Sequence, residues 1–234
     1  MNLIPKAAIV GMMQGQMLST GPVNTFIQTP SSQPITSDTI NRIWSQVIKE
    51  YPYQSLQLEP SGRGGVFIGG PDELVIIQPP LLQMRCRLDS DPTGIRGVAD
   101  KVHFVFGQIM HQLPSPPPLN LGVKLIYNTP APGGDAVAFA RTELVKGEDD
   151  LRTLAGGTSF VACIKVAMMN PDVNRTLLVE PLIADPTQLF LDLDSQFPGV
   201  VNPAQIREHI TGAGDFMTHQ VDSFLDARSA EWGA

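Results

Sequence analysis

The stretch PSPPP at residues 114–118 constrains the possible folds of this chain more than any other feature. Proline lacks the backbone N–H that a helix interior needs and fixes its own φ, so this run forms a stiff, extended connector. It divides the chain into a first half, residues 1–113, and a second half, residues 120–234, joined by residues 114–119. We expect the two halves to form one structural unit.

Both halves show the same succession of predicted elements. Apolar spacing typical of amphipathic helices covers residues 40–51 and 94–113 in the first half, and 135–155 and 202–225 in the second. Turn residues bound predicted strands near 6–17, 54–60, 64–69 and 73–88, and later near 120–128, 158–169, 174–184 and 188–195. Each half therefore reads strand, helix, three strands, helix, although the two sequences do not visibly match.

This order predicts an α+β fold class. Two pseudo-repeated strand-helix-three strands-helix halves would contribute mainly antiparallel strands to one curved sheet, with helices packed on one face. Thr36 or Ser37 can cap the first helix, and Asn202 can cap the last. Gly212 and Gly214 interrupt the last helix, which indicates a close approach to another backbone.

The composition favours some functions over others. With 42% hydrophobic and 17% charged residues, the chain has an ordinary globular composition. Its net charge of −7 argues against nucleic-acid binding, since phosphate contacts require a basic surface. No apolar run reaches the length of a membrane span. We expect a soluble, cytoplasmic protein with no membrane partner and no cofactor.

The two cysteines, Cys86 and Cys163, both fall in strand-like runs. A disulfide framework or a zinc site would need more cysteines at closer spacing. We therefore expect two buried thiols.

The last predicted strand, QLFLDLDSQF at residues 188–197, alternates between apolar and acidic side chains. Alternation of this kind places Leu189, Leu191 and Leu193 toward the core and Asp192 and Asp194 on the opposite face.

Turns at NPDVN and ADPT fix the register of the last three strands. With the first turn centred on its aspartate, Lys165 lies opposite Val179 or Glu180. With the second centred near its Asp-Pro pair, Glu180 lies opposite Asp192. Lys165, Glu180 and Asp192 would then form a charged ladder across three strands, with Asp194 one step further along the same face.

Several interpretations of this ladder remain open. Cross-strand ion pairs on a solvated face would explain it, and a carboxylate cluster of Glu180, Asp192 and Asp194 could instead bind a divalent metal in an enzyme. The same face would also carry apolar side chains, whereas a sheet face open to water is usually uniformly polar. A mixed face favours a ligand groove or a partner surface.

We therefore predict a non-catalytic protein that binds an unknown small molecule or a protein partner through the open sheet face. The expected binding residues are Lys165, Leu178, Glu180, Phe190 and Asp192. A metal-dependent enzyme is the alternative, and a nucleic-acid binder is the weakest one.

A second candidate metal set lies on the last helix. Asp215, His219, Asp222 and Asp226 fall at spacings of four, three and four residues, which places them on one face of a regular helix. The metal candidates among them are His219, Asp215 and Asp222. Such i,i+4 pairs are common on solvated helix surfaces. We therefore favour a solvated helix face over a metal site.

Three segments resemble a sporadically distributed, functionally uncharacterised prokaryotic protein family. These segments are NLGVKLIYNT at 120–129, LFLDLD at 189–194 and FMTHQVDSFLDA at 216–227. The resemblance implies the duplicated α+β layout and carries over no catalytic residues.

Overall fold

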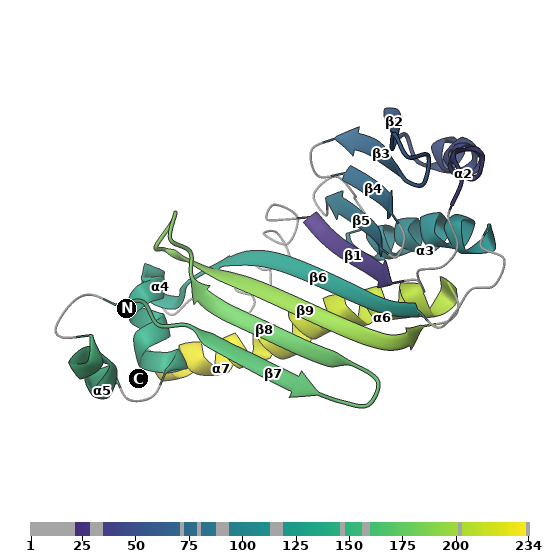
Figure 1. The fold of residues 1–234 in the computed structure, drawn as a ribbon. Coiled ribbons are helices and arrows are strands. Elements are labelled where there is room, and N and C mark those ends of the chain that lie inside the picture. The colour runs from purple at the N-terminus through teal and green to yellow at the C-terminus, as the bar shows by residue number, and fades with distance from the viewer. Residues whose placement is uncertain are drawn as a thin grey trace.

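A nine-stranded antiparallel sheet organises the computed structural model (Figure 1). The model describes residues 22–28, 35–70, 73–78, 81–87, 94–112, 119–145, 148–155, 160–200 and 203–232. The strand order is β2-β3-β4-β5-β1-β6-β9-β8-β7, and every neighbouring pair is antiparallel. The strands are β1 (Pro22–Gln28), β2 (Ser55–Leu58), β3 (Gly65–Gly70), β4 (Glu73–Gln78), β5 (Leu81–Arg87), β6 (Leu119–Pro130), β7 (Ile164–Met169), β8 (Asn174–Pro181) and β9 (Gln188–Val200).

Helices cover one face of this sheet, as the sequence predicts; α3, α6 and α7 lie behind it in Figure 1. The helical elements are α2 (Ser37–Glu50), α3 (Ile95–His111), the 3₁₀ turn η1 (Pro132–Gly134), α4 (Ala136–Phe139), the π-helical turn η2 (Ala140–Leu144), α5 (Glu148–Leu154), α6 (Pro203–Asp215), the π-helical η3 (Phe216–Val221) and α7 (Asp222–Trp232). The α+β fold class is thus confirmed.

Alternating burial along the strands shows which side chains meet the helices. Phe67 of β3 is fully buried and stacks edge-on against Trp44 of α2, with ring centroids 5.1 Å apart. In β9, Leu189, Leu191 and Leu193 are all fully buried, as their alternation with the aspartates predicts. The hydrophobic core therefore lies between this face and the helices.

The predicted strand count is wrong for the first half. Four strands follow α2, because the single strand expected over residues 73–88 is divided into β4 and β5, with Pro79 and Pro80 between them. A ladder hydrogen bond needs an N–H, which proline lacks, so the pair favours a strand break. The strand expected near 6–17 lies outside the described residues, and β1, which opens the described chain, was not predicted.

Other predictions can be compared directly with the structure. Thr36 caps α2, its Oγ1 accepting a hydrogen bond from the Thr39 N–H at 3.3 Å. The proposed cap Asn202 lies outside the described residues.

Cys86 is buried, but Cys163 is exposed, so the prediction of two buried thiols is wrong for Cys163. That residue precedes β7 and does not lie within it. No helix among the described residues is long and apolar enough to cross a membrane.

Candidate functional site: the open face of the sheet

The face of the sheet turned away from the helices, which we call the open face, carries all five residues predicted to bind a ligand. Lys165 lies opposite Leu178, and Leu178 lies opposite Asp192. Glu180 lies opposite Phe190, one step along the same face. The five side chains therefore share a face, but the predicted direct ladder of Lys165, Glu180 and Asp192 is wrong, because Leu178 occupies its middle position.

The centres of the two turns explain this difference. In the first turn, Asn170 and Val173 exchange backbone hydrogen bonds at 3.1 and 3.2 Å, so the centre lies between Pro171 and Asp172. The second turn centres on Asp185, whose carboxylate accepts from the Thr187 N–H at 3.0 Å. Each centre thus lies earlier in the chain than predicted, which shifts the pairing along the strands.

Asp192 forms an ion pair with Lys124 of β6, a partner that the sequence pattern does not predict. The Lys124 Nζ lies 2.8 Å from the Asp192 Oδ2, and the two side chains are 37% and 19% exposed. Their strands are directly paired, with Ile126 opposite Asp192 and Asp194 opposite Lys124. Alternation within β6 could have placed Lys124 on the open face. The two residues are far apart in the sequence, and no local pattern indicates that they meet.

Apolar side chains surround this ion pair. Ile126, Leu178 and Phe190 lie on the open face and are each partly buried. In the first half, Val66 lies opposite Ile76 and Ile68 opposite Leu74, and these four are also partly buried on the open face. The open face is therefore mixed in character across both halves, whereas a sheet face in bulk water is usually more uniformly polar.

The predicted carboxylate cluster does not assemble. Among the described residues, no group of three or more His, Cys, Asp or Glu side chains could hold a metal ion, and this covers Glu180, Asp192 and Asp194. Asp192 is instead paired with a lysine, and Asp194 accepts a hydrogen bond from the Gln196 side-chain amide at 2.6 Å. The two aspartates thus interact with neighbouring side chains of the sheet.

The second candidate metal set, on the last helix, does not lie on one exposed face. The π-helical η3 has a wider turn than an α-helix, which shifts the phase of the residues that follow. Asp215 and His219 are exposed, with the His219 Nδ1 2.9 Å from the Asp215 carbonyl oxygen, whereas Asp222 is only 6% exposed. The prediction that these three residues share one solvated helix face is therefore wrong. Burial raises the pKa of Asp222, nearby Asp226 raises it further, and His219 lowers it in part.

A polar cluster lies on the helix side of the first half. Lys101 of α3 forms an ion pair with Glu73 of β4, and its Nζ lies 5.2 and 5.0 Å from the ring centroids of Tyr51 and Tyr53. Burial raises the pKa of the Tyr53 hydroxyl, and Cys86 and Glu73 raise it further. Cation–π contacts and the ion pair stabilise the junction of α3 with the sheet, so this cluster has a structural explanation.

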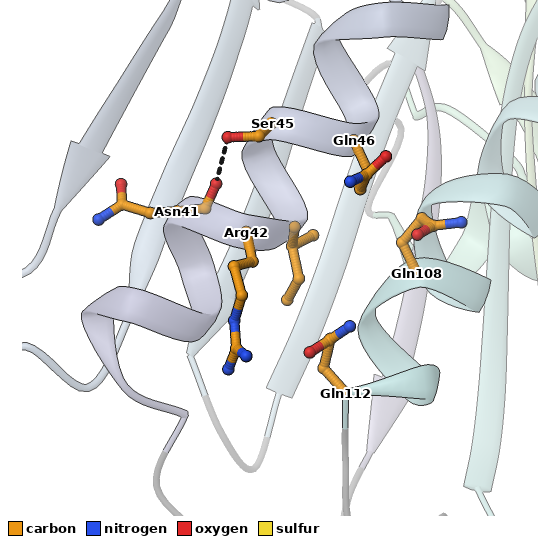
Figure 2. A pocket seen from close by; sticks show the side chains of 7 residues that line it. Asn41, Arg42, Ser45, Gln46, Gln108 and Gln112 are labelled. Carbon is orange, nitrogen blue, oxygen red and sulfur yellow. Dashed lines mark hydrogen bonds between the residues drawn. The ribbon is translucent and has the colours of Figure 1, made fainter.

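A surface pocket of about 300 Å³ lies between α2 and α3. Figure 2 shows the side chains of Gln46, Gln108 and Gln112 around it, beside Arg42. Ser45 donates to the Asn41 carbonyl at 2.8 Å. Amide side chains both donate and accept hydrogen bonds, so this pocket suits a neutral polar group. The sequence does not indicate this pocket, because polar residues on exposed helix faces carry no distinguishing pattern.

The comparisons with known proteins give little guidance. No family model and no curated protein matches the chain. Among solved structures, it has a likeness to the di-domain ARO/CYC BexL from the BE-7585A biosynthetic pathway, with 11% identity and a TM-score of 0.20, covering 88% of this chain and 97% of that chain. A likeness of this size carries no inference about fold or function.

Proposed function

We propose that the protein is a non-catalytic binding protein whose open face receives a ligand or a protein partner. The observation that carries this proposal is the cross-strand row of Ile126, Asp192, Leu178 and Lys165. Two apolar side chains alternate there with two charged ones on the face away from the helices. Mixed surfaces of this kind are typical of interfaces, in which apolar contacts give affinity and charges give orientation.

A protein partner fits the open face better than a small molecule does. Sites for small molecules are concave and enclose most of their ligand. The open face spreads partly buried apolar side chains over strands of both halves, from Val66 of β3 to Leu178 of β8. A broad surface of this kind is suited to a macromolecule.

The charges on the open face favour binding over the two alternatives. Its described charged side chains are balanced in sign: Arg85, Lys124 and Lys165 against Glu180, Asp192 and Asp194. A balanced face attracts phosphates weakly, which leaves nucleic-acid binding as the weakest interpretation. The Lys124–Asp192 ion pair partly neutralises one of the carboxylates that a metal-dependent enzyme would need.

Affinity capture from the native cell tests the proposal. Wild type is compared with the open-face variants Leu178→Lys and Phe190→Lys and with the control Ile183→Lys, whose side chain is 95% exposed in the β8–β9 turn. We expect a partner that is retained by wild type and by the control but lost from both face variants, with circular dichroism showing all four folded. If every retained molecule binds the face variants as well as wild type, the proposal is wrong.

A separate measurement tests the enzyme alternative. Addition of Mg²⁺, Mn²⁺ or Ca²⁺ should leave the melting temperature of wild type and of Asp192→Asn equally unchanged. A rise in wild type that Asp192→Asn abolishes would instead support a metal site on the open face.

A further inference from the structure

The strand β7 (Ile164–Met169) forms one border of the sheet (Figure 1), and it carries exposed apolar side chains. Among the described strands it pairs with β8 alone, so its outer edge presents backbone N–H and C=O groups. Val166 and Met169 are 40% and 86% exposed, and Val161, just before the strand, is 59% exposed. An edge of this kind is a template for pairing with another strand.

The other border of the sheet, β2, differs in the features that protect an edge. β2 has four residues, includes the polar Ser55 and Gln57, and is followed directly by Glu59 and Pro60. β7 has six residues, pairs with β8 without a bulge, and has Lys165 as its single charged residue. Short length, charge and proline discourage edge pairing. Of these three protective features, β7 has only a charged residue, Lys165.

We propose that β7 pairs with β7 of a second copy of this chain, antiparallel and about a two-fold axis through Ala167. The two sheets would then join edge to edge, with both helix layers on one side and both open faces on the other. This inference goes beyond the proposed function and does not depend on it.

The geometry of strands limits the position of the axis. For the helix layers to lie on the same side, residues that face each other across the axis must point to the same face, so the axis must pass through a residue and not between two. The two residues nearest the middle of β7 are Val166 and Ala167. The register therefore has two central choices.

Charge selects between these choices. With the axis through Val166, Lys165 lies opposite Ala167 of the second copy, and the two lysines are diagonal neighbours at about 8 Å, where like charges repel. With the axis through Ala167, Lys165 lies opposite Met169, and the lysines are about 14 Å apart along the paired strands. That separation exceeds the Debye length of about 8 Å at physiological salt. The axis through Ala167 is therefore favoured.

The same register matches apolar groups. On the helix side, Val166 lies opposite Met168 of the second copy, which is already packed against the core. On the open face, the exposed Met169 lies against the aliphatic stem of Lys165. Residues 160–171 include no Asp or Glu, so a chain of net charge −7 brings no carboxylates together at this seam. The edge is thus complementary to itself, which is the condition for a two-fold interface.

Sedimentation of the full chain tests this interface. We expect a particle of twice the 25.3 kDa chain mass. The variant Val166→Lys/Met169→Lys should be a monomer that keeps the circular dichroism spectrum of the folded wild type. Both side chains are solvent-exposed, and the lysine introduced at position 169 would face Lys165 of the second copy across the seam. Ile183→Lys makes the same kind of change at an exposed position away from β7 and should remain a dimer. A monomeric wild type, or a dimer that survives the double substitution, overturns the proposal.

Cysteine cross-linking tests the axis without relying on the lysine variant. In a Cys163→Ser background, Ala167→Cys should form a disulfide-linked dimer under mild oxidation, because the axis places each new thiol beside its own copy. Val166→Cys in the same background should give no more than a trace of disulfide-linked dimer. Efficient cross-linking at Val166 in place of Ala167, or at neither position, contradicts the proposed seam.

Discussion

Gly214 of α6 lies so close to Ile95, the first residue of α3, that a Cβ on the glycine would stand 2.7 Å from the Ile95 Cγ1. Gly212, two residues earlier on the same helix, faces open space. The sequence pattern predicts a close approach at both glycines. Of the two glycines, Gly214 makes the close approach, and it meets the side chain of Ile95. This contact joins α6 of the second half to α3 of the first.

This pair of glycines gives a matched prediction. Gly214→Ala should lower the free energy of unfolding by about 1–3 kcal/mol, because the added methyl group overpacks the contact with Ile95. Gly212→Ala should raise it by about 0.5–1 kcal/mol, because alanine favours the helix and meets no neighbour there. Urea unfolding of both variants measures the difference. Equal stabilities would contradict the close packing of α3 on α6.

The neighbouring residues Phe190 and Leu191 test the assignment of the two sheet faces. Leu191→Ala should cost about 2–5 kcal/mol of unfolding free energy, because Leu191 is fully buried under the helices. Phe190→Ala should cost only about 1 kcal/mol, since its ring is partly exposed on the open face. Denaturant titration of the two variants checks this order. A larger loss for Phe190→Ala would mean that the open face is covered.

The Lys124–Asp192 ion pair is open to a double-mutant cycle. Lys124→Met and Asp192→Asn, alone and combined, should give a coupling free energy of about 0.5 kcal/mol, since a pair that retains solvent contact is worth little. The coupling should shrink as salt is added. If it stays constant in high salt, the pair is more deeply buried than its exposed fractions indicate.

Asp222 predicts a pH dependence of stability. Burial raises its pKa in the folded protein, so the unfolded chain loses this proton at a lower pH than the folded one does. The contribution of Asp222 to the free energy of unfolding should therefore fall as the pH rises from about 3.9, the unfolded value, through the folded-state pKa, and should stay constant above it.

Asp222→Asn removes this titration. Its stability relative to wild type should rise across the same interval and remain constant at higher pH, as measured by thermal unfolding at a series of pH values. Asp226→Asn serves as a control that removes a neighbouring charge and should reduce the slope without abolishing it. A wild type whose stability relative to Asp222→Asn does not change with pH would contradict the burial of a raised-pKa carboxyl.

Local patterns predicted much of the fold. The cap at Thr36 and the period of the apolar residues after it located α2 close to its observed start. Alternation in the last strand assigned Leu191 and Asp192 to opposite faces correctly, because side-chain direction in a strand depends only on parity. Helix capping, helical periodicity and strand alternation depend on residues close together in the chain, so a single sequence is enough to predict them.

Other features depend on geometry that the sequence does not display. A proline-aspartate pair fits several turn centres, so the partner of Lys165 was displaced along β8. The π-helical η3 changes the phase of the last helix, and no residue type marks it, so Asp222 was placed in solvent although it is buried. The partner of Asp192 lies on β6, and only the long-range pairing of β6 with β9 brings Lys124 to it.

The pairing of β1 with β6 at the centre of the sheet has a consequence for folding kinetics. The β7–β8 hairpin pairs Met169 with Asn174, five residues apart, whereas the β1–β6 pairing joins Asn24 to Lys124, one hundred residues apart. Contacts with large sequence separation form late, because the entropy of loop closure must be overcome first. The hairpins of both halves should therefore form before the two halves meet. Until then β1 and β6 would each expose a bare edge, so the folding chain is most prone to aggregation in the interval just before its centre closes.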